Sequence, residues 1–189
     1  MFSDRISDPA FARYVKNSNR WAAIFSVGLA VAAVIGFFVA GEMDGSEMGN
    51  PESLFIGLGI GGMFMVIALF QIIGRNRSRT WDGRVVDKRI EQKRRRRETG
   101  NNDYYWEDYL IYAVFVRSDD GRIHRITAEN DDTVFSYWAI GDRVRHHGGL
   151  NSYEKEDKSR DSIIFCNACG FLHDIHEDRC HRCGCPLLK

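Results

Sequence analysis

Four cysteines near the carboxyl end of the chain form two copies of one short motif. The copies are Cys166-Asn167-Ala168-Cys169-Gly170 and Cys180-His181-Arg182-Cys183-Gly184, and ten residues lie between Cys169 and Cys180. A CxxC pair places two thiols on one tight turn, and the glycine that follows permits the chain to turn closely beneath the sulfurs. Two such pairs supply the four sulfur ligands that form a tetrahedral shell around a metal ion. The spacing therefore predicts a metal site with the ligands Cys166, Cys169, Cys180 and Cys183.

A shell of four protein thiolates leaves no position for water or substrate, so the predicted site is structural. Its binding energy would fold a segment of about 24 residues that is too small to hold itself together. Four sulfurs suit zinc or iron, and zinc is favoured because no redox motif accompanies them. Cys185, His173, His176 and His181 are interpreted as exposed residues outside the shell. The alternative is a catalytic zinc ion with His173 or His176 in place of one cysteine.

Residues 163–189 resemble zinc ribbons, with the four cysteines at the ligand positions of that family. Phe171, Leu172 and Leu187 are available for a small core. The segment is also similar in part to the rubredoxin-type iron knuckles, which share the CxxCG unit. The resemblance to zinc ribbons implies a structural zinc ion, and the resemblance to rubredoxin implies iron and a redox role.

Two uncharged apolar runs, residues 21–41 and 53–74, dominate the first half of the chain. At about 1.5 Å per helical residue, a run of about 20 residues matches a hydrocarbon core of about 30 Å. The runs predict a transmembrane helical hairpin. Ser26 and Gln71 are polar side chains within it, and it has no ionisable residue, which indicates an anchor and not a transport path.

The 26 basic and 26 acidic residues balance, but they are segregated along the chain. Residues 1–20 and 75–97 are rich in Arg and Lys, whereas the connection at residues 42–52 carries only acids. The positive-inside rule then predicts cytoplasmic termini, an outer loop at 42–52 and a multi-pass protein of the bacterial inner (plasma) membrane. In the reducing cytoplasm, paired thiols are metal ligands more readily than disulfides.

Small residues recur at four-residue spacing in both apolar runs. The first run has Gly28, Ala32, Gly36 and Ala40, and the second has Gly57 and Gly61. Such stripes let helix backbones approach closely, and the nearest partner is the other helix of the hairpin. Homo-oligomerisation is the alternative. Before the hairpin, residues 1–20 are predicted to contain a short interfacial helix with Asp8 as its N-cap and Pro9 at its first position.

From residue 80 the apolar pattern changes to short strands, predicted at 83–90, 109–116, 122–127, the apolar run 134–140 and around Val144. Four or five short strands over residues 80–150 indicate a small antiparallel barrel or sandwich. Gly83-Arg84-Val85-Val86, Gly121 in a turn and Gly141-Asp142-Arg143-Val144 resemble bacterial membrane proteins that carry a cytoplasmic β domain after two helices. They are more distantly similar to barrels of the NfeD type, which implies a fold and a location. The charged residues 151–162 are predicted to be a linker.

Lys93, Arg94, Arg95, Arg96 and Arg97 form a basic run in a predicted loop between the first two strands. Basic side chains near a membrane attract anionic head groups, at about 1 kcal/mol each. Tyr104, Tyr105 and Trp106 follow, so nucleic acid is the alternative ligand. Residues 98–165 hold fourteen acids and eight bases, which disfavours nucleic acid.

These patterns favour a membrane-anchored, non-catalytic binding or scaffold module, whose soluble part holds an unidentified protein partner. A redox component with an iron knuckle is the first alternative. A membrane-tethered nucleic-acid-binding protein is the second, although the three acids and three bases of residues 163–189 do not form a basic surface.

Overall fold

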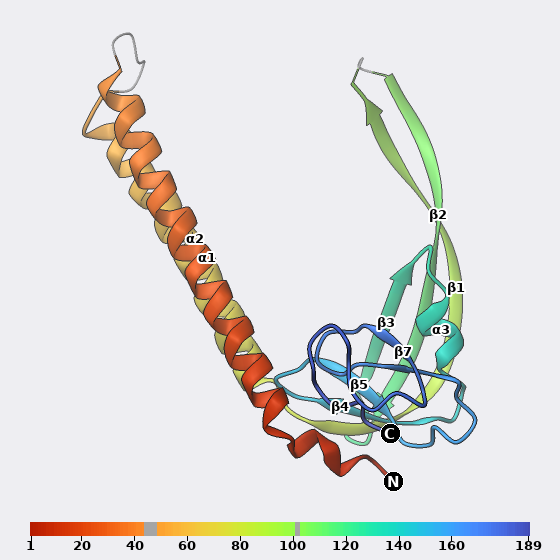
Figure 1. Ribbon diagram of the computed structural model, residues 1–189. Helices are drawn as coiled ribbons and strands as arrows, with labels where there is room; N and C mark the ends of the chain where they lie inside the picture. Colours follow the sequence, from red (N-terminus) through yellow and green to blue (C-terminus); the bar gives the residue numbers. More distant parts are fainter. Residues whose placement is uncertain (44–48, 101–102) are drawn as a thin grey trace. The chain divides into compact units, whose positions relative to one another are not determined.

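The computed structural model describes residues 1–43, 49–100 and 103–189, and it divides into two compact units (Figure 1). The helical unit is Asp8–Ser78. The soluble unit combines Met1–Ser7 with Arg79–Lys189, so it contains both ends of the chain. The predicted outer loop lies partly outside the described residues.

The first helix, α1, runs from Pro9 to Glu42 without interruption. The Asp8 carboxylate accepts a hydrogen bond from the backbone N–H of Ala10 at 2.8 Å, so the predicted cap and first position are both present. The predicted lead-in helix is not separate, because no glycine or proline interrupts residues 10–27. At about 1.5 Å per residue, α1 is longer than a hydrocarbon core of about 30 Å.

The second helix, α2 (Glu52–Arg77), packs against α1 through its glycines. A methyl group on Gly61 would lie 3.1 Å from the carbonyl oxygen of Ala30, and one on Gly57 would lie 2.9 Å from Cβ of Phe37. Both glycines therefore allow the close backbone approach that the sequence predicts within the hairpin.

The small-residue stripe predicted on α1 does not take part in this packing. A methyl group on Gly28 or Gly36 would meet nothing within 4 Å. The residues of α1 that meet the glycines of α2 include Ala30, Ala33 and Val34, which lie on a different face. The prediction that α2 packs against the other helix of the hairpin is confirmed. The prediction that the stripe of Gly28 and Gly36 forms the contact face of α1 is wrong.

Both helices are long and apolar enough to cross a membrane. None of the most apolar window of α1 is buried by protein, and 22% of that of α2 is buried, so neither is the core helix of the described unit. Large apolar side chains such as Phe25, Ile35 and Phe70 are half or more exposed to the surroundings.

The soluble unit is built on one antiparallel sheet with the strand order β3-β2-β1-β4-β5. The strands are β1 (Trp81–Thr99), β2 (Asp103–Ser118), β3 (Ile123–Glu129), β4 (Arg143–His147) and β5 (Ser152–Lys155). Within the described residues β3 and β5 do not pair with each other, so the sheet is not closed into the predicted barrel. The predicted strands at 83–90 and 109–116 lie within β1 and β2.

The outer halves of β1 and β2 extend beyond the rest of the sheet as a two-stranded arm (Figure 1). We define the arm as residues 92–99 and 103–110, which pair with each other and not with β3 or β4. The predicted loop at 93–97 is therefore wrong, because these residues are part of strand β1. Cross-strand pairs on both faces stabilise the ladder, including an ion pair of 2.5 Å between Arg95 and Glu107.

The core lies where the sheet meets the short helix α3 (Thr133–Tyr137). Its buried members are Val85, Val114, Val116, Tyr137, Trp138 and Val144. The apolar run 134–140 contributes α3 and not a strand, because Asp131 accepts a hydrogen bond from the N–H of Thr133 at 2.9 Å and starts a helical turn.

Strand β5 occupies the segment that was predicted to be a linker. It pairs with β4, and its Glu154 and Lys155 are buried. The ammonium group of Lys155 lies 2.8 Å from the Asp161 carboxylate, which also ties the following residues to the sheet. The charged composition of this segment therefore reflects buried ion pairs, and the linker prediction is wrong for residues 152–155.

The cysteine segment is attached to this sheet by packing as well as by the chain. Strands β6 (Ile163–Phe165) and β7 (Leu172–Asp174) form a separate two-stranded sheet. The ring of Phe165 lies edge-on to that of Tyr137, with 5.1 Å between centroids. The segment is thus part of the soluble unit and not an independent appendage.

Candidate metal centre

The two CxxCG motifs fold into two matching turns, which we call the knuckles. In the first, the N–H of Gly170 donates to the carbonyl of Cys166 at 2.8 Å, and in the second, the N–H of Gly184 donates to the carbonyl of Cys180 at 2.8 Å. Both glycines have a φ of 72°, a left-handed conformation that costs glycine little. This is the close turn that the sequence predicts after each pair.

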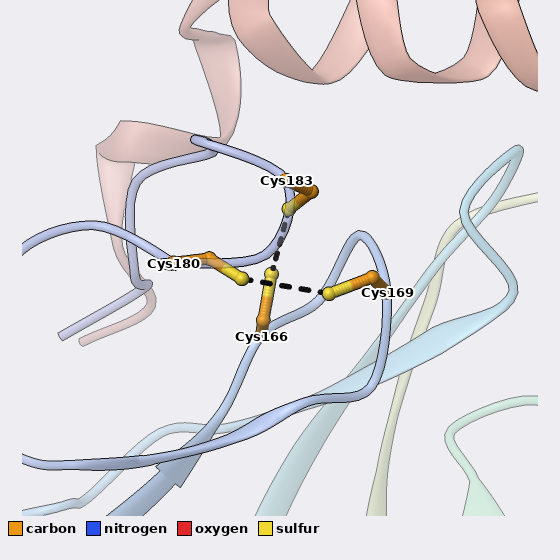
Figure 2. Close-up of side chains that lie close together, drawn as sticks. All are labelled: Cys166, Cys169, Cys180 and Cys183. Carbon is orange, nitrogen blue, oxygen red and sulfur yellow. Dashed lines mark hydrogen bonds between the residues drawn. The ribbon is translucent and has the colours of Figure 1, made fainter.

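The knuckles bring the four predicted ligand sulfurs together (Figure 2). The Sγ atoms of Cys166 and Cys183 are 3.5 Å apart, as are those of Cys169 and Cys180, and all four lie within 4.8 Å of one another. A tetrahedral metal ion with bonds of about 2.3 Å needs sulfurs about 3.8 Å apart, whereas a disulfide needs about 2 Å. The geometry therefore fits a metal ion, and this donor set suits zinc or iron.

The four thiols differ in how readily they lose their protons. Burial would raise the pKa of Cys180, but backbone N–H groups of the second knuckle and the side chain of His173 lower it to about 6. Burial raises the pKa of Cys169 to about 11 and also raises that of Cys166. Cys180 is thus the first thiolate available to a metal ion, and binding must displace the remaining protons.

Cys185 is not one of the four clustered cysteines, but it is fully buried, so its interpretation as an exposed residue is wrong. Its carbonyl accepts a hydrogen bond from the N–H of Cys180 at 2.8 Å, so its backbone supports the second knuckle. Burial and the neighbouring Cys183 raise the pKa of its thiol to about 12, which keeps it protonated and unreactive.

A second cluster of possible ligands lies between the knuckles and was not predicted from the sequence. His173, Glu177 and His181 each offer a ligand atom, and these atoms lie within 4.8 Å of one another. His173 is 4% exposed, so its interpretation as an exposed residue is wrong. His176, by contrast, is exposed and does not belong to the cluster. Their spacing at i, i+4 and i+8 was the available signal, but no helix carries them: His173 lies on β7, Glu177 in the following loop and His181 in the second knuckle.

The double histidine of β4 is not part of the metal centre. His146 stacks on Trp81 with 5.2 Å between ring centroids, and its Nδ1 lies 3.1 Å from the carbonyl oxygen of Arg79. His147 lies on the opposite face, with its Nε2 2.7 Å from the Glu154 carboxylate. The two imidazoles therefore face different surroundings.

A cleft of about 390 Å³ separates the first knuckle from the sheet core. Its lining includes Tyr137, Trp138 and Phe165 of the core and residues 166–170 of the first knuckle. No acidic, basic or histidine side chain of the described residues lines it. Its polar lining consists of tyrosine, serine, asparagine and cysteine side chains, including two of the clustered cysteines, Cys166 and Cys169.

Comparisons of this chain with protein-family models, curated proteins and solved structures gave no match.

Proposed function

We propose that this protein is a membrane-anchored, non-catalytic binding module of the bacterial inner membrane. The helical unit is the anchor, a structural zinc ion holds the two knuckles, and the arm contacts the surface of the lipid bilayer. The arm, with its exposed aromatic side chains, is the observation that carries the proposal.

The membership of the soluble unit supports a hairpin topology. The N–H of Ser3 donates to the Glu154 carboxylate at 2.8 Å, so the segment before α1 and the segment after α2 belong to one folded unit. Two segments that pack in one unit must lie on the same side of a membrane. The Arg and Lys residues that flank the helices favour the cytoplasmic side.

A thiol introduced outside the cell membrane should react with an impermeant reagent in intact cells. We expect Ser46→Cys to be labelled and Ser159→Cys to be labelled only after the cells are permeabilised. Mass spectrometry of the labelled peptides separates them from the native cysteines. Labelling of Ser159→Cys in intact cells, without labelling of Ser46→Cys, would place the soluble unit outside and contradict the topology.

The arm exposes aromatic side chains close to its tip. Tyr104, Tyr105 and Trp106 are 51%, 52% and 61% exposed. Tyr104 and Trp106 share one face of the ladder, and the guanidinium of Arg96 lies 3.5 Å from the centre of the Tyr104 ring. Aromatic rings with a polar group, next to arginines, are typical of side chains that settle at a membrane–water interface.

The positive charge of the arm is largely compensated by its own carboxylates. Arg95 and Arg97 lie 2.5 Å and 2.9 Å from one oxygen of Glu107, and Arg94 lies 3.0 Å from Asp108. Hydrogen bonds from the two guanidinium groups lower the pKa of Glu107 to about 2, so this pairing is present at neutral pH. The aromatic side chains, and not five free charges, therefore provide the main attraction to lipid.

The short connection between the units favours the bilayer as the arm's partner over nucleic acid. Three residues separate the end of α2 from the start of β1, and such a connection spans at most about 14 Å. The soluble unit is therefore held close to the anchor, and its arm, which begins eleven residues further along β1, stays at a high effective concentration near the bilayer.

The test is the fluorescence of Trp106 in the full-length protein reconstituted into vesicles. With brominated lipids in the bilayer, we expect quenching of the part of the emission that is lost in Trp106→Phe. Arg94→Gln combined with Arg96→Gln should weaken this quenching, and added salt should reduce it only in part. Equal quenching of the wild type and of Trp106→Phe would contradict lipid contact. Release of the arm by added RNA would favour nucleic-acid binding.

A further inference from the structure

We propose that His173, Glu177 and His181 form a second metal site, which binds one divalent ion of the zinc class next to the four-cysteine site. The three residues come from different parts of the cysteine segment. His173 lies on β7, His181 lies in the second knuckle, and Glu177 lies in the loop between them. Folding of the knuckles is therefore what brings them together.

Both imidazole nitrogens lie close to one carboxylate oxygen of Glu177. The Nδ1 atom of His173 lies 2.5 Å from Oε2 of Glu177, and Nε2 of His181 lies 2.9 Å from the same oxygen. Bonds of about 2.0 to 2.1 Å to a tetrahedral zinc ion need ligand atoms about 3.3 Å apart. Small rotations of the outer side chains supply this difference, because the side chain of His181 is 75% exposed.

The donor set is the one that catalytic and exchangeable zinc sites use. Two imidazoles and one carboxylate give three protein ligands, and the fourth position stays open to water or to a ligand from a partner. Imidazole nitrogen also suits divalent nickel and cobalt, which makes cobalt a useful probe. The site differs in this respect from the four-cysteine shell, which is closed.

Two features of the surroundings favour a cation here. His173 is buried on β7, so its ring is held in place with Nδ1 facing the Glu177 carboxylate. Four thiolates around a divalent ion also leave the neighbouring centre with a net negative charge. A metal ion can reach the proposed site from solvent, because the side chains of Glu177 and His181 are both partly exposed.

A hydrogen-bonded triad without metal is the competing interpretation, and metal counting separates the two. Purified full-length protein, equilibrated with zinc and freed from excess ion, should hold two zinc ions per chain. Glu177→Gln and His181→Ala should hold one each, and His176→Ala, a neighbouring histidine outside the cluster, should hold two. In a cobalt titration, the intense sulfur-to-cobalt absorption should be complete before the weaker bands of the second site appear.

Each other result overturns the proposal. One zinc ion in the wild type and in every variant shows that the triad is held by hydrogen bonds alone. Loss of the sulfur-to-cobalt absorption in Glu177→Gln or His181→Ala shows that the triad supports the knuckles and does not bind an ion of its own.

Discussion

Cys166→Ser is expected to abolish metal binding at the four-cysteine site and to unfold the segment from residue 163 to the end of the chain. A structural zinc ion contributes about 10 to 16 kcal/mol in small zinc-binding peptides, which is as large as the whole stability of a typical domain at about 5 to 15 kcal/mol. A serine oxygen replaces one of four thiolates, so most of this stabilisation is lost. The sheet should remain folded but weaker, because Phe165 packs against Tyr137.

Elemental analysis and hydrogen exchange of the full-length protein measure this effect. We expect amides of residues 163–189 to exchange rapidly in Cys166→Ser, while those of the paired strands β1 and β2 stay protected. Cys185→Ala is the matched control, since it removes a buried thiol beside the site without removing a ligand. Loss of the metal in Cys185→Ala would show that the ligand set is wrong, and a red, iron-containing product would favour the redox alternative.

Glu154→Gln should destabilise the soluble unit by about 3 to 5 kcal/mol, the usual cost of breaking a buried ion pair from one side. The Glu154 side chain is fully buried and makes contacts in three directions. Its carboxylate lies 2.7 Å from His147, 3.1 Å from Lys158 and 2.8 Å from the N–H of Ser3. Glutamine fills the same volume but carries no charge. The ammonium group of Lys158 then loses its ion-pair partner.

The Glu154 carboxylate also makes the stability of the soluble unit depend on pH. Burial raises the pKa of Glu154, but His147, Ser3 and Lys158 outweigh burial and lower it below the ordinary value of 4.5. Its contribution is therefore complete above pH 4.5 and is lost as the pH falls through the lower, folded-state pKa. Urea denaturation at neutral pH and near pH 3 should show a smaller acid effect in Glu154→Gln than in the wild type.

Glu156→Gln is the control for this experiment. The Glu156 side chain is 37% exposed and meets the amino terminus at 3.6 Å, so its replacement should cost less than about 1 kcal/mol. If Glu154→Gln and Glu156→Gln lower the free energy of unfolding equally, the buried contacts of Glu154 contribute no more to stability than the exposed ion pair of Glu156.

Local patterns in the sequence predicted the parts of this molecule that depend on near neighbours. The CxxCG spacing predicted which four sulfurs meet, and helix periodicity with small residues predicted that Gly57 and Gly61 face α1. The cap at Asp8 was also readable, since a cap involves only residues that are close in sequence.

The errors arose where distant partners decide the structure. Residues 151–162 look like a solvated linker because their charges are visible in the sequence, while the partners that bury Glu154 and Lys155 are not. The basic run 93–97 looks like a loop until Glu107 and Asp108 are placed opposite it. His173 was interpreted as exposed because the sequence does not show how the loop after β7 turns back to bring Glu177 within 2.5 Å of it.

The contacts of residues 1–7 also have a consequence for biosynthesis. These residues are synthesised long before their partners: the N–H of Ser3 donates to Glu154, and the guanidinium of Arg5 lies 3.3 Å from Asp178. Both helices are synthesised in between, so with the hairpin in the membrane the soluble unit is completed only after insertion. A bulky fusion at the amino terminus should therefore impair assembly of the finished protein more than one at the carboxyl end of the chain.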